Sequence, residues 1–350
     1  MGAGSGLRSA VERAWWNPRW SLAALALSPL ALLYGVALAL RRAAYATGLR
    51  RPWRAPVPVI VVGNLIVGGA GKTPTVIALV DALRRQGWTP GVISRGHGAR
   101  LSTARAVHAG STAADVGDEP LLLHRRTGVP VWVGHDRRAV AASLCAAHPR
   151  VDLLIADDGL QHLALARDAQ LVVFDARGFG NGLLLPAGPL RERRWRRLPP
   201  RTLVIYNGCE ASTPLPGEVA AAALGEVWPL AAWWAGDRSA ALPLDRLRGR
   251  RVRAAAGIGH PERFFTMLER RGLSVERWPL PDHAPLEPRP WPRDGARVVV
   301  TEKDAVKLPP DAPDAADILV ATLDSSLPPA AVERLVSWLP SPSRRPPPAF

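Results

Sequence analysis

The hydrophobic and polar positions divide the chain into parts with different patterns. Residues 20–40 contain no charged side chain, whereas short apolar runs alternate with amphipathic segments from residue 57 onward. A run of about 20 apolar residues is long enough to cross a bilayer core as a helix. The pattern therefore predicts one long apolar helix followed by a folded α/β region.

The residues that flank this apolar segment favour contact with a membrane. Trp15, Trp16 and Trp20 lie at its start, and several arginines follow it, namely Arg41, Arg42, Arg50, Arg51 and Arg54. Interfacial tryptophans and a trailing basic cluster are typical of an anchor whose downstream side faces anionic cytoplasmic lipid. A cleaved signal peptide and a buried core helix are the alternatives. Pro29 leaves open whether the helix spans the bilayer or lies along its surface.

The apolar runs after the first segment predict buried strands of a mostly parallel sheet. These runs are residues 57–62, 91–93, 131–133, 151–156, 171–174 and 203–206. After the first run, apolar positions recur with helical spacing, and Pro74 suits the first turn of that helix. Strands that alternate with helices predict a sheet covered on both faces, an α/β/α architecture.

A second strand-and-helix series begins near residue 250. It contains predicted strands at 252–256, 297–300 and 318–321 and predicted helices at 261–271 and 330–339. We expect four parts: an N-terminal hydrophobic helix in 1–54, a core domain in 55–235, a smaller C-terminal α/β domain in 236–339, and a disordered proline-rich tail in 340–350.

A glycine-rich segment between the first strand and the first helix of the core predicts a phosphate loop. It reads Ile66, Val67, Gly68, Gly69, Ala70, Gly71, Lys72, Thr73. Glycines let backbone N–H groups approach phosphates, and the helix N-terminus adds a favourable dipole. Lys72 would contact the phosphate oxygens and Thr73 would ligate Mg²⁺, so the cofactors expected are ATP and Mg²⁺ in a P-loop NTPase-like core. Ile66 stands where the strict pattern has glycine, and an ordinary glycine turn is the alternative.

Acidic residues follow other strands of the same series. Asp157 and Asp158 end a buried strand, where carboxylates can hold a magnesium shell beside a phosphate loop, although Asp-Asp-Gly is also a common turn. Asp118 opens a predicted helix and is either a helix cap or a base near an attacking hydroxyl. Arg95 and Arg137 also follow strands, so they should reach the same sheet edge and contact a substrate phosphate or solvent.

The charge of the chain points to a polyanionic partner. Lys and Arg number 45 against 30 Asp and Glu, a formal net charge of +15, which suits nucleic acid or an anionic membrane surface. Residues 191–197 concentrate part of this charge around Trp195, as a solvated turn or a contact with lipid headgroups. The two cysteines cannot form a disulfide framework, which fits a reducing compartment.

Seven motifs carry a family resemblance, and they occur in the order GGxGKTP, SRGxG, GDEP, DDGLQH, FGNGxxLPAGPLRE, GIGxPxRFF and TEKDAVK. Between residues 53 and 307 the chain resembles the tetraacyldisaccharide 4′-kinase family of the lipid A pathway. The resemblance implies transfer of the ATP γ-phosphate to the 4′-hydroxyl of a tetraacylated diglucosamine 1-phosphate, which forms lipid IV-A at the cytoplasmic face of the bacterial inner membrane. It also implies two α/β/α domains, the smaller of which closes over the nucleotide.

The same resemblance assigns roles to single residues. It implies that Asp118 is the catalytic base, that His260 orients or tunes it, and that Lys72 is catalytic. It implies that Asp157 and Asp158 hold magnesium. Arg95, His97, Glu119 and Arg137 are the candidate contacts to the acceptor. The chain departs from the family pattern at His97, where tyrosine is usual, and at residues 281–284, which match the family's Asp-His segment in part.

The partners expected are therefore the lipid disaccharide and anionic inner-membrane lipids, with no nucleic acid, for a protein that acts as a monomer. The alternative is a P-loop NTPase switch or metallochaperone at the membrane. A nucleic-acid-binding protein would account for the charge but would leave the apolar helix unexplained.

Overall fold

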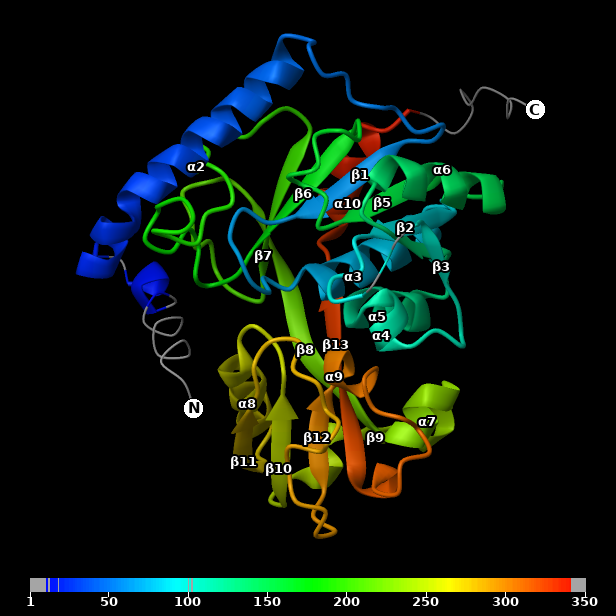
Figure 1. The fold of residues 1–350 in the computed structure, drawn as a ribbon. Helices are drawn as coiled ribbons and strands as arrows, with labels where there is room; N and C mark the ends of the chain where they lie inside the picture. Colours follow the sequence, from blue (N-terminus) through cyan, green and yellow to red (C-terminus); the bar gives the residue numbers. More distant parts are fainter. Residues whose placement is uncertain (1–10, 12, 18, 100, 102, 341–350) are drawn as a thin grey trace.

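The computed structural model describes residues 11–340 apart from residues 12, 18, 100 and 102. In this part of the chain, thirteen strands pair in the order β11-β10-β12-β13-β8-β7-β6-β1-β5-β2-β4-β3, with β9 beside β8. Helices cover both faces of this sheet (Figure 1). The predicted fold class, a mostly parallel α/β sheet with an N-terminal apolar helix, is confirmed. The tail predicted to be disordered lies, from residue 341, outside the described residues.

The first series contains the strands that the apolar runs predict, and neighbouring strands are parallel except β3 and β4. Its strands are β1 (Val59–Gly63), β2 (Pro90–Ser94), β3 (Arg105–Val107), β4 (Val131–Val133), β5 (Leu153–Asp157), β6 (Ala169–Phe174) and β7 (Thr202–Asn207). Its helices are α3 (Lys72–Arg85), α4 (Ala113–Val116), α5 (Asp118–Thr127) and α6 (Arg137–Ala147). Every residue of β1, β2, β5, β6 and β7 is buried, as the unbroken apolar runs require.

The second series pairs β11, β10, β12 and β13 in parallel. Its strands are β8 (Glu218–Pro229), β9 (Leu242–Pro243), β10 (Arg251–Ala256), β11 (Ser274–Pro279), β12 (Val298–Thr301) and β13 (Ile318–Ser326). Its helices are α7 (Leu230–Ala235), α8 (Pro261–Arg270), α9 (Glu302–Ala305) and α10 (Pro329–Ser337), with 3₁₀ turns at Arg238–Ala240, Leu244–Leu247 and Ala315–Asp317.

Strand β8 joins the two series. Its first residues, from Glu218 to Ala220, run parallel to β7, and its remainder runs antiparallel to β13. The sequence pattern does not predict this strand, because its alanine-rich stretch favours a helix. The two series are therefore continuous through backbone hydrogen bonds, which sets the position of one relative to the other.

The core extends across this junction. Leu79 of α3 and Val300 of β12 belong to one cluster of buried side chains, and Ala331 and Leu335 of α10 belong to the same cluster. Helix α10 thus returns to the first series and packs on α3 (Figure 1). Helix α10 therefore stabilises the position of α3, the helix predicted to follow the phosphate loop.

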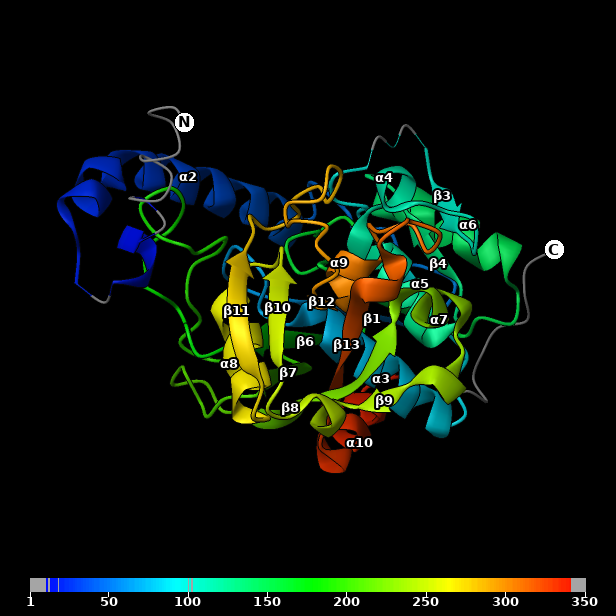
Figure 2. The ribbon, with the colours of Figure 1, turned by 90° about the horizontal axis from the view of Figure 1, so that it is seen from below.

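The predicted apolar helix is α2 (Leu22–Ala46), which lies along the outside of the body (Figures 1 and 2). By length and composition it is long and apolar enough to cross a membrane. Tyr34, near its middle, donates a hydrogen bond from its hydroxyl to the Arg191 carbonyl at 2.9 Å, and Arg42 pairs with Glu192. Its outer side exposes large apolar side chains, namely Leu22, Leu25, Leu30, Leu32, Leu33, Val36 and Leu40.

Glu302 contributes a buried ionic contact between the two series. Its carboxylate accepts hydrogen bonds from Arg126 at the end of α5, from the Trp233 indole at 3.1 Å and from the Leu323 amide at 3.2 Å. Removal of the carboxylate would leave the largely buried Arg126 charge with the more exposed Asp324 carboxylate at 3.3 Å as its remaining acidic partner. We predict that Glu302→Ala lowers the free energy of unfolding by about 3 kcal/mol.

Chemical denaturation of the full chain in detergent measures this effect. Glu333→Ala, at an exposed position on α10, is the matched control and should change the free energy of unfolding by less than about 0.5 kcal/mol. Equal denaturation midpoints for the two variants would contradict the structural role of Glu302.

Candidate active site

The phosphate loop connects β1 to α3, as the sequence predicts. Gly71 precedes the helix with a φ of 84°, and a Cβ atom there would lie 1.5 Å from Asn207 Nδ2. Only glycine fits this position, because both the backbone angle and the space exclude a side chain. Lys72 begins the helix and is buried, and its Nζ lies 3.3 Å from Asn64 Oδ1 and 3.5 Å from Asp158 Oδ1.

The first two residues of the predicted nucleotide loop have another role. Ile66 is fully buried and forms a β-bridge with Leu190, and the Val67 amide donates to the Pro189 carbonyl at 2.9 Å. These contacts anchor the loop to the 189–190 segment and leave neither residue on the adjoining pocket. The departure of Ile66 from glycine therefore has a packing explanation.

A pocket of about 470 Å³ lies beside this loop and between the two series. Gly69, Gly71, Lys72 and Thr73 line one side. Apolar side chains from both series line much of the rest, namely Ile77, Leu122, Leu224, Ile258, Phe264, Met267 and Leu323, and charged side chains such as Arg177, Arg263 and Lys303 also reach the pocket. A pocket of this size with a phosphate loop at one end and apolar walls suits a nucleotide.

The two acids after β5 have different surroundings. Asp157 is buried, accepts a hydrogen bond from Ser94 at 3.3 Å, and has no partner for Oδ1 among the described residues. Burial, with the nearby Glu119 and Asp158 carboxylates, raises the pKa of Asp157 to about 7. Its buried oxygen without a partner is an available acceptor for a cation, which is compatible with the predicted magnesium role.

Asp158 is instead held by cations of the protein. Arg191 Nη1 donates to both of its oxygens, at 2.8 and 2.9 Å, and Lys72 lies on the same carboxylate. Burial alone would raise the pKa of Asp158, but Lys72 and Arg191 outweigh it and lower the pKa to about 2. Its backbone has a φ of 47°, a left-handed conformation that costs a non-glycine residue about 1 kcal/mol or more. Asp158 therefore stays ionised and orients Lys72.

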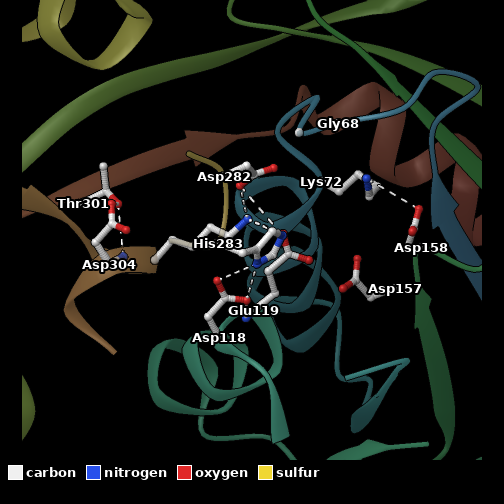
Figure 3. Close-up of polar contacts among 12 residues, drawn as sticks. Gly68, Lys72, Asp118, Glu119, Asp157, Asp158, Asp282, His283, Thr301 and Asp304 are labelled. Carbon is white, nitrogen blue, oxygen red and sulfur yellow. Dashed lines mark hydrogen bonds and ion pairs between the residues drawn. The ribbon is translucent and has the colours of Figure 1, made fainter. Parts of the chain in front are cut away.

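Asp118 pairs with His283, a residue of the 281–284 segment to which the sequence pattern assigns no role. His283 Nδ1 lies 3.1 Å from Asp118 Oδ1 and 2.8 Å from Oδ2 (Figure 3). Burial would raise the pKa of Asp118, but the His283 hydrogen bond and the charge of Lys303 hold it below its usual value. The same hydrogen bond raises the pKa of His283, against burial and Lys303. Asp118 is thus a buried carboxylate that remains ionised near neutral pH.

The expectation that His260 orients Asp118 is corrected by this geometry. The His260 imidazole accepts a hydrogen bond from the Arg263 amide at 3.2 Å and caps α8, where it lines the pocket. The 281–284 loop is held at the end of β10, because the His283 amide donates to the Gly257 carbonyl at 3.2 Å. The departure of this loop from the family pattern hid the histidine that contacts Asp118.

The remaining predicted residues lie around this pair. His97 is exposed and its ring centroid lies 5.0 Å from that of His283, while Glu119 pairs with Lys303 at 2.9 Å. Arg95 is exposed after β2. Arg137 is buried and donates to the Asp157 carbonyl at 2.9 Å, and burial lowers its pKa to about 10. Arg137 thus stabilises the end of β5, which carries the two acids. The side chains of Arg95 and His97 are exposed and accessible to an incoming molecule.

Comparisons with known proteins show the family of the chain and the likeness of its fold. The family described as Tetraacyldisaccharide-1-P 4′-kinase matches residues 23–340. The chain is 51% identical to the tetraacyldisaccharide 4′-kinase of Leptothrix cholodnii over 99% of both chains. It is 56% identical to that of Methylibium petroleiphilum over 82% of this chain and 81% of the relative. A crystal structure of LpxK from Aquifex aeolicus in complex with ATP superposes with a TM-score of 0.73 at 25% identity, and covers 91% of this chain and 99% of that one.

Substitution of Asp157 should separate stability from activity. Because its pKa is raised from 3.8 to about 7, the native state keeps a proton that the unfolded chain loses, so the wild type loses stability as pH rises from about 4 to about 7. Asp157→Asn removes this loss. We predict that the variant is more stable than the wild type at pH 8, on the order of 1 kcal/mol, while turnover falls about 100-fold or more.

Denaturation at pH 5 and pH 8, with activity assays on the same preparations, checks this prediction. Asp81→Asn, on the exposed side of α3, is the control and should change neither property. A variant that is less stable than the wild type at pH 8 but not at pH 5 would show that the carboxylate is favoured in its native position.

Proposed function

The chain belongs to the tetraacyldisaccharide-1-P 4′-kinase family, and from this membership we propose how its pocket carries out the reaction. Its activity is the ATP-dependent phosphorylation of a tetraacyldisaccharide in lipid A biosynthesis. We propose that the γ-phosphate passes to the 4′-hydroxyl of a tetraacyldisaccharide 1-phosphate and that the product is lipid IV-A. The observation that carries the site assignment is the ionised Asp118 carboxylate, which is hydrogen-bonded to His283 and lies in the same site as Lys72 (Figure 3).

In this proposal Asp118 is the catalytic base. The acceptor hydroxyl lies against its carboxylate, the O–H proton moves to an Asp118 oxygen, and the acceptor oxygen bonds to the γ-phosphorus as the bond to ADP breaks. Lys72 contacts the phosphate oxygens, and Asp158 with Asn64 holds its ammonium in place. His283 orients the base. His260, as a wall of the pocket, contacts the nucleotide.

The residues at the end of β5 fit a magnesium ion. Asp157 offers an unpaired oxygen, and the Thr73 hydroxyl lies on the pocket beside the phosphate loop. Among the described residues no three His, Cys, Asp or Glu side chains form a metal cluster, which suits an ion that keeps water and phosphate ligands. When bound, Mg²⁺ neutralises charge on the phosphate oxygens. Asp158 is the second acid at the end of β5. Its carboxylate is bound by Arg191 and orients Lys72.

The acceptor would enter over the exposed residues near Asp118. Arg95 and His97 lie open at the carboxyl ends of the strands and suit contacts with a phosphorylated sugar. Glu119 and Arg137 act through other residues, since Glu119 pairs with Lys303 and Arg137 binds the strand end. This places the acceptor on the side of the pocket opposite Lys72 and Asp158, which Figure 3 shows away from Asp118.

We propose that α2 lies in the membrane surface and does not cross the bilayer. Tyr34 is halfway along α2 and its hydroxyl donates a hydrogen bond to the body of the protein. The body is therefore attached at the midpoint of the helix, where a spanning helix would lie in the bilayer core. The arginines at 193, 194, 196 and 197 are exposed just after the docking residue Glu192 and would meet anionic headgroups. In this proposal the basic residues bind anionic lipid and not nucleic acid. The enzyme acts at the cytoplasmic face of the inner membrane, and it acts as a monomer.

The division into parts follows from the same arrangement. We propose that residues 1–54 form the membrane segment, 55–235 the kinase core and 236–339 the smaller α/β domain. Strand β8 and helix α10 then connect the last two parts, because β8 pairs with β7 and with β13 and α10 packs on α3. The smaller domain carries His283, so its position decides whether the base is oriented.

Transfer of label from ATP to the lipid acceptor tests the function and the roles of two residues. We predict that Asp118→Asn lowers kcat about 100- to 10,000-fold with little change in the KM for ATP, since it removes a general base and no phosphate contact. Lys72→Ala should instead weaken phosphate handling. Asp115→Asn, three residues before Asp118 and exposed, is the control for a local charge change.

The same assay distinguishes the alternative function. Acceptor-independent ATP hydrolysis with no labelled lipid would indicate an NTPase switch. Equal loss of ATP binding in Asp118→Asn and Lys72→Ala would contradict the base assignment.

Membrane attachment through the exposed side of α2 can be measured by vesicle sedimentation. We predict that replacing Leu32 and Leu33, which are 67% and 66% exposed, by serine lowers binding to anionic vesicles at least about tenfold. Each substitution removes apolar surface that would be buried in the membrane. Val219→Ser, at an exposed apolar position of β8, is the control and should bind as the wild type does. Unchanged sedimentation of the double variant would argue against this face as the membrane contact.

A further inference from the structure

Lys303 occupies the centre of a charged network between the two series. It lies in α9, and its Nζ is 2.9 Å from Glu119 Oε1, 3.1 Å from Asp282 Oδ1 and 3.2 Å from His283 Nε2. Its side chain is 14% exposed. The reaction described above gives it no role, although it contacts the residue that orients the base.

The contact with His283 has a defined chemical meaning. A lysine ammonium has three donors and no acceptor, and both nitrogens of a charged imidazole are also donors. An imidazolium Nε2–H facing the ammonium at 3.2 Å would place two donors and two positive charges against one another. The contact is favourable when Nε2 carries no proton and accepts from Lys303.

Lys303 itself keeps its proton. Burial would lower its pKa, but the carboxylates of Glu119, Asp118 and Asp282 raise the pKa well above its usual range. The lysine therefore acts as a fixed donor toward Nε2. With Nε2 an acceptor, the single proton of a neutral imidazole is on Nδ1, and Nδ1 faces Asp118 at 2.8 Å.

We propose that Lys303 is a positioning residue that holds His283 in its neutral Nδ1–H tautomer and thereby orients Asp118 as an ionised base. This proposal rests on the assignment of Asp118 in the proposed function. Glu119 connects the network to the other series, because it belongs to α5 with Asp118 whereas Lys303 and His283 belong to the second series. Asp118 is therefore oriented as a base when these contacts between the two series are formed.

The tautomer also determines the path of the proton. Nδ1 already carries a hydrogen, and Nε2 is occupied by the Lys303 ammonium. The proton taken from the acceptor hydroxyl therefore forms an O–H bond on Asp118 and remains there until the product leaves, while His283 and Lys303 keep the protons they began with. His283 is an orienting donor in this scheme and not a relay.

Other groups around His283 are consistent with this assignment. Its neighbour Asp282 lies 3.8 Å from Nε2, the His97 ring packs against its face, and Figure 3 shows His283 between Asp282 and Asp118. Its backbone has a φ of 59° and is held by the hydrogen bond to Gly257. Lys307 is close enough to influence Asp118, but its Nζ binds Asp304 and the Ala284 carbonyl and not His283.

The tautomer can be observed directly in the full chain. With ¹⁵N-labelled histidine in detergent micelles, and with His283→Gln to assign the signals, the wild type should show a protonated Nδ1 and an unprotonated Nε2 for His283 at neutral pH. This readout needs neither ATP nor the lipid acceptor, so it is decided separately from the proposed function. An imidazolium or an Nε2–H tautomer in the wild type would overturn the proposal.

Variants at position 303 test the role of the lysine. Lys303→Met removes the donor and its charge, so the pKa of His283 should rise and the imidazole should leave the Nδ1–H form. We expect kcat for lipid phosphorylation to fall about 100-fold and the acidic limb of the kcat/KM profile to move to higher pH. Lys303→Arg keeps a cation without an acceptor and should restore the tautomer and most of the activity.

Lys307→Met is the matched control, because it removes a nearby positive charge that does not touch His283. It should keep the Nδ1–H signal. An unchanged tautomer in Lys303→Met, or the same loss of tautomer in Lys307→Met, would overturn the proposal. If Lys303→Met does not fold, the wild-type spectrum and Lys303→Arg still decide it. Failure of the wild type to phosphorylate the lipid would contradict the proposed function and leave the spectroscopic result to stand by itself.

Discussion

The hydrogen bond between Asp118 and His283 connects residues that are 165 positions apart, and the chemistry of the site depends on it. A contact of this kind forms when two separately built α/β series are held at fixed positions. Strand β8 provides this fixation, since its backbone pairs with β7 of one series and β13 of the other. Glu302 adds a buried ionic contact to Arg126 at the opposite end of the helix that Asp118 begins. Together, the strand pairing and the ionic contact hold His283 of the second series within hydrogen-bond distance of Asp118 in the first.

The charges of the pocket are arranged so that each acidic group has a different state. Asp158 is ionised because Lys72 and Arg191 neutralise it, whereas burial without a paired cation on its oxygens raises the pKa of Asp157. Asp118 lies between these cases, since a histidine and Lys303 offset its burial. In the proposed mechanism these aspartates serve for orientation, for a cation and for proton transfer, and their states differ because of both burial and partners.

The sequence predicts the parts of this arrangement that depend on local pattern. The strands of the first series, the phosphate loop and the acids after β5 follow from apolar runs and glycine spacing, which act over a few residues. Strand β8 is not predictable in this way, because alanine favours a helix until a neighbouring strand supplies its hydrogen bonds. His260 follows a glycine turn and begins a helix, so its pattern resembles a functional loop, whereas His283 lies in a loop without a periodic signal. Its partner Asp118 comes from a distant segment, and single-sequence reasoning has no measure of that proximity.

A series of contacts also connects the membrane segment to the phosphate loop. Tyr34 of α2 binds the Arg191 carbonyl, the Arg191 side chain holds Asp158, and Asp158 lies on Lys72. On the other side of the same loop, Arg177 donates to the Gly69 carbonyl at 2.7 Å while its guanidinium stacks on Trp16, 4.4 Å from the ring centre. Residues that precede and form the apolar helix are thus connected through a few contacts to Gly69 and Lys72 of the phosphate loop. In the proposed orientation, with α2 in the membrane surface, this arrangement would place the phosphate donor at a defined height above the membrane, because the helix and the loop are held by the same segment of chain.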